Sequence, residues 1–343
     1  MLPRSRSPRA LVLLTVLALA SVGLSSPVDA QRPAGGQHVV AKAVAKKDPR
    51  KTRGLFVDPR MPAANHGAPY KKALGTKAQA LWIIPEAYAT MRVRSVVRAY
   101  TSRALKARKT PMLTVYGIPG RDCGGQSSSG ALKNATQYRA WIRQIAAGLK
   151  QQRALVILEP DALPLFSGSG CASPPAGWVA MLRFASKTLS KSGAWVYLDA
   201  GHSNWTPYDN RPTLLKQAGV AYDRGISTNV SNFRPTGDEQ RYAATMLAGL
   251  RKLGVRGKHY VVDTSRNGAA PSSDGYDVLN PLWARVGKAP RLVFKGAFDG
   301  TLWVKHPGES DGQVNGGSSS GTWCDMLADR LLTGSSSESS CPE

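Results

Sequence analysis

Short apolar runs separated by longer amphipathic stretches recur along most of this chain. Between the runs, apolar residues return at helical spacing, which predicts helices at 138–153, 178–190 and 238–253. Uninterrupted apolar strands that alternate with helices are typical of a parallel sheet covered on both faces. The runs that predict buried strands lie at 55–57, 112–118, 154–159, 194–199, 226–230, 259–263 and 301–305.

This pattern fills residues 54–333, and a region of about 280 residues suits a single large α/β domain. A closed (β/α) barrel with parallel strands is the leading architecture at this length. An open, doubly wound sheet is the alternative.

The two ends of the chain differ from this region. Residues 1–30 combine a basic start, an apolar run and a small-residue site after Ala30, which predicts a signal peptide and a secreted protein. An uncleaved anchor is the alternative, although the apolar run is short for a membrane span. Residues 31–53 predict a basic, disordered leader, and residues 334–343 form a Ser-rich tail that contains Cys341.

The composition is strongly basic, with 46 Lys and Arg against 22 Asp and Glu and a formal net charge of +24. Such a charge raises the question of a polyanionic partner. The basic residues are scattered, however, and the dense stretch 91–109 alternates them with apolar positions like a solvated helix face. No nucleic-acid-binding motif accompanies them, so we expect no nucleic-acid partner, while attraction to acidic cell-wall polymers stays open.

The four cysteines are Cys123, Cys171, Cys324 and Cys341. An even number of cysteines in an exported chain indicates two disulfides, and the sequence alone allows three pairings. Their spacing is not that of metal ligands, so we expect no metal site.

Aspartates follow several of the predicted strands. Asp122, Asp161 and Asp311 come a few residues after a strand, while Asp199 and Asp263 each end one. In a barrel the carboxyl ends of the strands face the active site, so this spacing gathers the carboxylates around one opening. A single aspartate in such a place often caps the next helix, but capping is a poor explanation for the whole set.

The folded region also contains six distinctive blocks in a fixed order: VYGIPGRDCGGQSSSG (115–130), LVILEPDALP (155–164), VYLDAGHSNW (196–205), GISTNVSNF (225–233), VVDTSRNG (261–268) and LWVKHPGESDG (302–312). Together they resemble glycoside hydrolase family six, which contains endo-β-1,4-glucanases and cellobiohydrolases. The resemblance implies a distorted, incompletely closed TIM-like barrel. It also implies hydrolysis of a β-1,4-glucan with inversion of the anomeric centre and no cofactor.

The resemblance assigns roles to the aspartates. Asp161 matches the family's proton donor, and burial after an apolar strand would raise its pKa. Asp122 matches the aspartate that raises the pKa of the donor by like-charge proximity, with Arg121 beside it to orient it or keep it ionised. Asp311 matches the carboxylate proposed as catalytic base. Activation through a chain of waters is the alternative, with Ser128 in the place of the serine that holds the water.

Sugar rings bind on flat apolar faces with polar groups around them. Two tryptophans on predicted strands, Trp195 and Trp303, are expected in the core instead. The other strand-end carboxylates, Glu159, Asp199 and Asp263, are expected to support loops through hydrogen bonds. By resemblance, the residues that line the sugar-binding cleft are Tyr116, Trp82, Trp205, His202, Asn229, Asn232, Lys305 and Glu309.

The sequence departs from the family after residue 268. Val278 and Leu279 stand where the family commonly has Trp and Cys. A stacking platform for the sugar is therefore missing unless Trp283 replaces it, and one family disulfide has lost a partner.

The resemblance pairs Cys123 with Cys171, and the lost partner leaves Cys324 to pair with Cys341. Residues 313–323 are a short Gly/Ser stretch where cellobiohydrolases of the family carry longer loops that roof the cleft. We therefore expect an open cleft and cleavage of internal bonds in cellulose or a related β-glucan. We expect a monomer without a membrane partner. A non-catalytic or weakly active glycan-binding protein on the same scaffold is the alternative.

Overall fold

The computed structural model of the chain describes residues 48, 54–128, 130–270 and 279–342. All of them belong to one compact unit that spans Val44–Glu343. The signal peptide predicted at 1–30, and the leader predicted at 31–53 apart from Asp48, lie outside the described residues.

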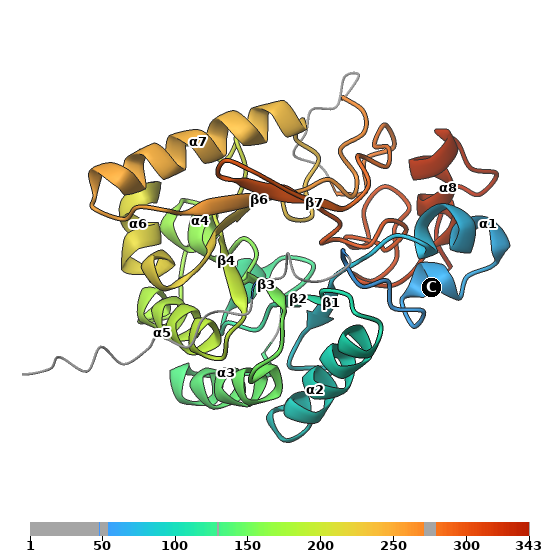
Figure 1. Cartoon of the computed structure of the whole chain (residues 1–343). Coiled ribbons are helices and arrows are strands. Elements are labelled where there is room, and N and C mark those ends of the chain that lie inside the picture. Colours follow the sequence, from blue (N-terminus) through green and yellow to red (C-terminus); the bar gives the residue numbers. More distant parts are fainter. Residues whose placement is uncertain (1–47, 49–53, 129, 271–278, 343) are drawn as a thin grey trace, which may run out of the picture. The chain divides into compact units, whose positions relative to one another are not determined.

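Eight strands form one sheet in the order β1-β2-β3-β4-β5-β6-β8-β7 (Figure 1). The pairs from β1 to β6 and the pair β6–β8 are parallel, and β7 alone runs antiparallel to its neighbour. The strands are β1 (Leu81–Ile83), β2 (Met112–Val115), β3 (Leu155–Leu158), β4 (Trp195–Asp199), β5 (Gly225–Thr228), β6 (His259–Asp263), β7 (Arg291–Lys295) and β8 (Phe298–Leu302).

The strand order decides between the two architectures that the sequence allowed. A doubly wound sheet reverses its strand order at a switch point. Here β1 to β6 lie side by side in chain order, as in a (β/α) barrel, so the doubly wound alternative is wrong. The sheet is curled but incompletely closed, because no strand ladder joins β1 to β7 or β8 among the described residues. The prediction of a distorted TIM-like barrel is confirmed.

The open seam between β1 and β8 is held by single hydrogen bonds. The backbone N–H of Ala80 donates to the carbonyl of Trp303 at 3.1 Å. The indole N–H of Trp82 donates to the carbonyl of Val304 at 2.8 Å. These contacts bring the segment before β1 against the end of β8, where Lys305 and the block around Asp311 begin.

Helices return the chain from the carboxyl end of one strand to the start of the next. Figure 1 shows α2, α3 and α5 side by side, covering neighbouring strands. The helices are α2 (Thr90–Lys106), α3 (Ala135–Leu149), α4 (Ala162–Ser167), α5 (Trp178–Lys191), α6 (Arg211–Gln217), α7 (Thr236–Lys252) and α8 (Asp325–Thr333). Shorter turns are η2 (Pro62–Ala64), α1 (Ala68–Tyr70), η3 (Lys71–Gly75), η4 (Arg121–Gly124) and η5 (Val220–Tyr222).

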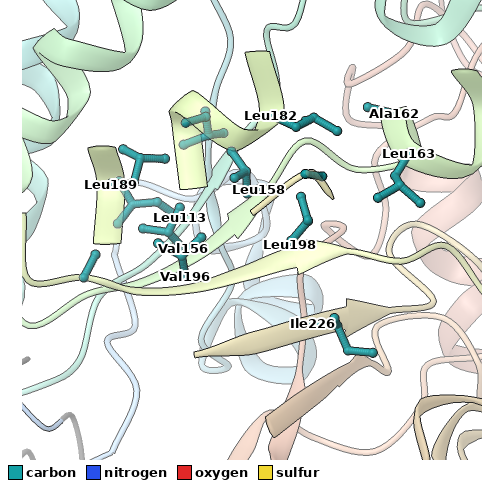
Figure 2. Close-up of a cluster of buried hydrophobic side chains, with 14 of the residues drawn as sticks. Leu113, Val156, Leu158, Ala162, Leu163, Leu182, Leu189, Val196, Leu198 and Ile226 are labelled. Atoms are coloured by element: carbon teal, nitrogen blue, oxygen red, sulfur yellow. The ribbon is translucent and has the colours of Figure 1, made fainter. Parts of the chain in front are cut away.

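The core follows from the alternation of side chains along each buried strand. Leu113, Val156 and Val196 point to the side covered by helices, where Leu182 and Leu189 of α5 meet them (Figure 2). Their neighbours along the strands point the other way, into the barrel, where the second cluster contains Met112, Leu155, Ile157, Trp195 and Tyr197. Burial on both faces explains why these strands have no polar alternation in the sequence.

Two expectations about strands were wrong. The run at 55–57 forms only an isolated bridge between Leu55 and Thr110. The strands β1 and β7 were not predicted. β1 has only three residues, and β7 is an edge strand whose side chains alternate between exposed and half-buried, so neither presents a long apolar run.

Both predicted disulfides are present. Cys123 bonds Cys171, with their Cα atoms 5.5 Å apart, and Cys324 bonds Cys341, with their Cα atoms 5.4 Å apart. The second bond fixes the Ser-rich tail beside the start of α8. Within the described part of the chain, no helix combines the length and the apolar character that crossing a membrane requires.

Candidate active site

Four carboxylates meet at the carboxyl ends of the strands. Asp122 follows β2, Asp161 follows β3, Asp199 ends β4 and Asp311 follows β8. The three others all lie close enough to Asp161 for their charges to raise its pKa. The sequence-based prediction that strand ends gather these groups around one place therefore agrees with the structure.

Asp161 sits at the start of α4 in a left-handed backbone conformation, with φ 66°. Such a conformation is uncommon outside glycine and is held here by the surrounding structure. Within the described residues its carboxyl group accepts no hydrogen bond. Burial raises the pKa of Asp161 well above its usual value, and the charges of Asp199, Asp122 and Asp311 raise it further. No hydrogen bond from the described residues offsets these effects, so the environment favours the protonated form of Asp161.

Asp199, which lies beside Asp161, differs from it because its carboxylate accepts several hydrogen bonds. Its Oδ2 accepts hydrogen bonds from the backbone N–H groups of Asp161 and Gly201, each at 3.0 Å, and its Oδ1 accepts one from Ser227 at 3.0 Å. Burial raises the pKa of Asp199 to about 7, while these hydrogen bonds and the charge of Arg211 oppose the rise. Hydrogen bonds to the ionised form favour it, so Asp199 ionises before Asp161 as the pH rises.

Replacing Asp199 with Asn is expected to move the alkaline limb of the kcat/KM profile to lower pH. The variant removes a negative charge beside Asp161, so the pKa of Asp161 falls. If Asp161 is the general acid, the active protonated form is then lost at lower pH. Measuring kcat/KM on a neutral β-glucan across the pH range tests this. An unchanged alkaline limb would show that Asp199 does not set the pKa of the acid.

Asp122 lies in the turn η4, also with positive φ, at 58°. Its Oδ2 accepts a hydrogen bond of 2.6 Å from the N–H of Ser127. Burial raises the pKa of Asp122, while the Ser127 bond and the charge of Arg121 oppose the rise. The adjacent Cys123–Cys171 disulfide ties this loop to the segment after α4.

Arg121 does not form an ion pair with Asp122. Its Nη1 contacts Glu86 Oε2 at 3.0 Å, and its Nε donates to the Ser127 carbonyl at 2.9 Å. The guanidinium lies over the ring of Tyr116, 4.8 Å from its centroid. Arg121 therefore orders the loop and one wall of the site, and acts on Asp122 only through its charge.

Asp311 is ionised and doubly paired. Its Oδ2 lies 2.6 Å from Nη1 of Arg266, and its Oδ1 lies 3.2 Å from Nζ of Lys305. Burial raises the pKa of Asp311, but these two cations outweigh it and the net pKa is lowered. The backbone N–H of Asp311 also donates to Asn280 at 2.8 Å. Sequence reasoning quoted the block that contains Arg266 but did not single it out, although a buried carboxylate after a strand calls for a cation.

Two supporting carboxylates behave as predicted. Glu159 is buried and accepts hydrogen bonds from the N–H groups of Gly117 and Ile118 and from the hydroxyl of Tyr138. Burial raises the pKa of Glu159 to about 7. Asp263 accepts backbone hydrogen bonds from Ser231, Ser265, Val304 and Lys305, and so fixes two loops together.

Aromatic rings flank the carboxylates on two sides. Tyr116 is buried beside Asp161 and Asp122, and its ring meets that of Trp82 edge to face at 5.5 Å. Beyond Asp199, the rings of His202 and Trp205 lie 5.2 Å apart. Trp82 and Trp205 are both half-buried, so each presents part of its ring to solvent.

The polar residues predicted to line the cleft differ in how far their side chains are exposed to solvent. Asn229 is fully buried, and its amide donates to the Asp263 carbonyl and accepts from the Arg234 N–H. Asn232 is half-buried and donates to the Val230 carbonyl. Asn229 therefore shapes the loop from beneath. Ser128 is exposed at the rim, where its backbone N–H donates to Gly125 at 3.1 Å.

The loop of Asp122 and the Gly/Ser stretch after Asp311 touch each other. The hydroxyl groups of Ser127 and Ser320 lie 2.7 Å apart, and the N–H of Gln313 donates to the side chain of Gln126 at 3.4 Å. A hollow open to solvent adjoins this contact and is lined by Gly120, Arg121, Cys123, Gly124, Ser128, Gly130, Ala172 and Ser173.

Trp283 does not replace the missing stacking platform. It is buried, and its ring packs edge to face on Phe233 at 5.7 Å, in a cluster with Ala284 and Leu331. Val278 lies outside the described residues. Trp195 and Trp303 are buried as predicted.

Between Lys305 and Glu309 in the sequence lies His306, which the sequence analysis did not include among the site residues. His306 Nδ1 lies 2.6 Å from Glu309 Oε1, and its Nε2 lies 2.6 Å from the carbonyl oxygen of Ala80. A carbonyl only accepts, so Nε2 carries a hydrogen, and the carboxylate contact places a second proton between Nδ1 and Glu309. Burial alone would lower the pKa of His306, but the Glu309 charge and both hydrogen bonds raise it, against the charge of Lys305.

Replacing His306 with Gln is expected to lower kcat/KM on a cello-oligosaccharide by about tenfold, because Glu309 loses a charge-assisted hydrogen bond worth about 1.5 kcal/mol. The expectation is that His306 acts through Glu309, so Glu309→Gln and the double variant complete the test. Non-additive losses are expected for residues that act as a unit. Losses that add fully would show that His306 has no effect through Glu309.

The barrel is incompletely closed and carries interacting carboxylates at the carboxyl ends of its strands. Glycoside hydrolases use paired carboxylates in sites of this kind. No group of three His, Cys, Asp or Glu side chains suited to a metal ion occurs among the described residues. The profile of the family "Glycosyl hydrolases family 6" matches residues 51–333. The chain therefore belongs to glycosyl hydrolases family 6.

Two curated relatives are similar to most of this chain. The chain is 38% identical over 288 residues to "Endoglucanase A" of Cellulomonas fimi, a match that covers 82% of this chain and 61% of the relative. It is 37% identical over 310 residues to "Endoglucanase A" of Thermobispora bispora, covering 88% and 65% respectively. The chain thus spans less than two thirds of the length of either relative.

A solved structure is similar over most of its length. The endoglucanase Cel6 from Mycobacterium tuberculosis, in complex with methyl-cellobiosyl-4-deoxy-4-thio-β-D-cellobioside, has a TM-score of 0.76 and 35% sequence identity to this chain. The similarity covers 83% of this chain and 98% of that one.

Proposed function

We propose that this protein is a secreted glycoside hydrolase that cleaves internal β-1,4-glucosidic bonds in cellulose or a related β-glucan with inversion. The observation that carries the proposal is the state of Asp161. Burial and three neighbouring carboxylates raise its pKa, and no hydrogen bond to its carboxyl favours ionisation. A carboxylic acid that keeps its proton is what protonation of a glycosidic oxygen requires.

The reaction follows from this arrangement. Asp161 gives its proton to the oxygen of the departing sugar as the bond to the anomeric carbon breaks. A water molecule attacks that carbon from the opposite face and loses a proton, either to Asp311 directly or through a chain of waters along Ser128. The charges of Asp122 and Asp199 favour the positive character that the sugar ring acquires in the transition state. The starting state is restored when the base releases its proton to solvent and Asp161 takes up a proton.

Asp311 fits the role of base only in part. Its ionised form is secured by Arg266 and Lys305, so it is ready to accept a proton at any ordinary working pH. The same two cations reduce its basicity, since a lowered pKa weakens the pull on the water proton. Both the direct route and the water chain therefore stay within the proposal.

The substrate class rests on the walls of the site and on the relatives. Trp82 and Trp205 present ring surface on opposite sides of the carboxylates, as stacking of successive sugar rings needs. The two relatives at 37–38% identity are named endoglucanases, and the similar solved structure holds a cellobiose-based thio-oligosaccharide. These likenesses support an endo-acting β-1,4-glucanase.

Release of reducing ends from a panel of soluble β-glucans tests the proposal. We expect release from mixed-linkage glucan and carboxymethylcellulose, with a fast fall in viscosity because internal bonds are cut. Binding to these polymers without any release of sugar would favour the alternative, a glycan-binding protein on the same scaffold. That alternative is motivated by the buried Trp283, which leaves one side of the cleft without its family platform.

A further inference from the structure

Exposed cations gather at the end of the barrel where strands begin and helices end. Since the strands from β1 to β6 and β8 are parallel, each returning helix ends at the same side as the next strand starts. We call this surface the basic end. Its exposed members are Lys106, Arg108, Lys150, Lys191, Lys216, Arg251, Lys252, Arg256 and Lys295.

The carboxylates near the basic end are buried, so they do not neutralise its exposed Lys and Arg side chains at the surface. Asp58, Asp223 and Asp299 are the carboxylates that the structure describes among these helix ends, connecting loops and strand starts, and all three are buried. Asp58 pairs with Arg103, and Asp299 with Arg224. Asp223 accepts a hydrogen bond from Ser190. The exposed charge of the basic end is therefore of one sign.

Several carboxylates that reach solvent lie at the opposite ends of the helices. Glu86 precedes the first residue of α2, Asp209 precedes α6, and Asp238 lies in the first turn of α7. That is the side of the barrel where Asp161 and the site are found. The two signs of charge are thus separated along the direction of the strands.

Helix dipoles explain part of this arrangement. Cations near helix C-termini interact favourably with the dipole, and Lys216 donates to the Leu253 carbonyl at the end of α7. The dipole effect ends within the last turn, however. Arg108, Arg256 and Lys295 lie in loops or at a strand end beyond it, so the dipoles do not account for them.

The chain also enters the domain at the basic end. The N–H of Thr110 donates to the carbonyl of Gly54 at 2.8 Å, just before β2 begins. The ten residues that precede Gly54 in the sequence, 44–53, include five Lys or Arg and one Asp. The sequence before this entry point therefore has an excess of basic residues.

We propose that the basic end binds an acidic polysaccharide, a linear glycan that carries carboxylates, while the catalytic cleft stays free. Single cations spread over several helix ends match the spaced charges of such a polymer. No exposed Trp, Tyr or Phe lies on this surface among the described residues, and base stacking on nucleic acids uses such rings. The large apolar side chains exposed near these cations are Leu105, Val57 beside Asp58, and Val293 on β7. Three single residues from different elements offer little apolar surface for insertion into a bilayer.

The position of the surface gives the binding a consequence. The basic end lies at the strand starts and the carboxylate site at the strand ends, so one molecule can hold an acidic polymer and a neutral glucan at once. Binding at the basic end does not depend on Asp161 or on the proposed hydrolysis. Failure of one proposal therefore leaves the other standing.

A charge-matched pair of variants tests the surface. The first replaces four lysines of the basic end with Gln, at Lys106, Lys150, Lys191 and Lys252. The control replaces four exposed lysines elsewhere with Gln, at Lys71, Lys72, Lys77 and Lys288. Both lose four positive charges, so a difference between them reports position and not net charge. Affinity for polygalacturonate is measured by titration calorimetry, with saturating cello-oligosaccharide present to fill the cleft.

We expect binding by the wild type that weakens steeply between about 50 mM and about 300 mM NaCl, as polyanion binding does. The basic-end variant should bind about tenfold or more weakly, the control less than about twofold, and both should keep wild-type hydrolysis of a neutral glucan. Equal losses in the two variants, no binding by the wild type, or release by cello-oligosaccharide would overturn the proposal. Tighter binding to duplex DNA or to vesicles with anionic lipids than to polygalacturonate would overturn the choice of partner.

Discussion

Replacing Asp161 with Asn is expected to reduce kcat on β-glucan by roughly 10²–10⁴-fold, the range in which positioned general acids contribute. Asn has the same shape but no proton to donate to the leaving oxygen. The carboxyl of Asp161 accepts no hydrogen bond in the described residues, so the change breaks no contact of that group. Reducing-sugar release, with thermal unfolding as the check on folding, measures the effect.

The size of the loss should depend on the leaving group. A substrate whose departing oxygen is weakly basic, such as a dinitrophenyl cello-oligosaccharide, needs little protonation, so Asp161→Asn should retain most of its rate on that substrate. The matched control is Asp209→Asn, an exposed aspartate before α6, which should behave as the wild type. Near-normal turnover of β-glucan by Asp161→Asn, or equal losses on both kinds of substrate, would contradict the assignment of the acid.

Replacing Asp311 with Asn is expected to lower kcat by roughly 10²–10³-fold and to destabilise the fold by about 3 kcal/mol. The destabilisation follows because Arg266 and Lys305, whose side chains are 3% and 8% exposed, lose their shared carboxylate partner. The loss of rate follows if the carboxylate takes the water proton. Chemical unfolding and kcat are measured on the same preparations, below the temperature at which the variant unfolds.

A second buried ion pair separates these two effects. The side chain of Asp58 is 3% exposed, against 9% for Asp311, and it pairs with Arg103, far along the chain from the carboxylate site. Asp58→Asn should therefore lower the unfolding free energy while leaving kcat intact. If Asp311→Asn loses stability but keeps kcat, the proton of the water goes elsewhere, and the chain of waters along Ser128 becomes the route.

The apolar pattern of the sequence predicts best the strands that are buried on both faces. Runs such as 154–159 and 194–199 have no polar alternation because helices cover one face and the barrel interior the other. The edge strand β7 and the three-residue β1 escaped prediction for the opposite reason. Neither is covered on both sides, so neither needs a continuous apolar run.

The carboxylate site was predictable because topology alone brings parallel strand ends together. The motif around Asp161 and its place after an apolar strand led to the proposal that Asp161 is the acid without any knowledge of distances. What sequence reasoning missed are partners that lie far apart along the chain. Arg266 contacts Asp311, 45 positions away in the sequence. His306, which also contacts Glu309, contacts Ala80, 226 positions away.

Other expectations depended on packing that a linear pattern does not record. Trp283 was offered as a stacking platform, but its ring fills a space beside Phe233. Arg121 was expected beside Asp122 because the two are adjacent in sequence. The positive φ of Asp122 turns the backbone there, and the guanidinium instead reaches Glu86.

The most direct test of the proposed function is the anomeric configuration of the first product, followed by NMR as wild-type enzyme acts on a soluble β-1,4-gluco-oligosaccharide. We expect the α-configured hemiacetal to appear first and to convert to the equilibrium mixture only afterwards, since water attacks from the face opposite the departing sugar. A β-configured first product would contradict inversion through Asp161 and a water. If no sugar is released at all, the proposed enzymatic activity is contradicted.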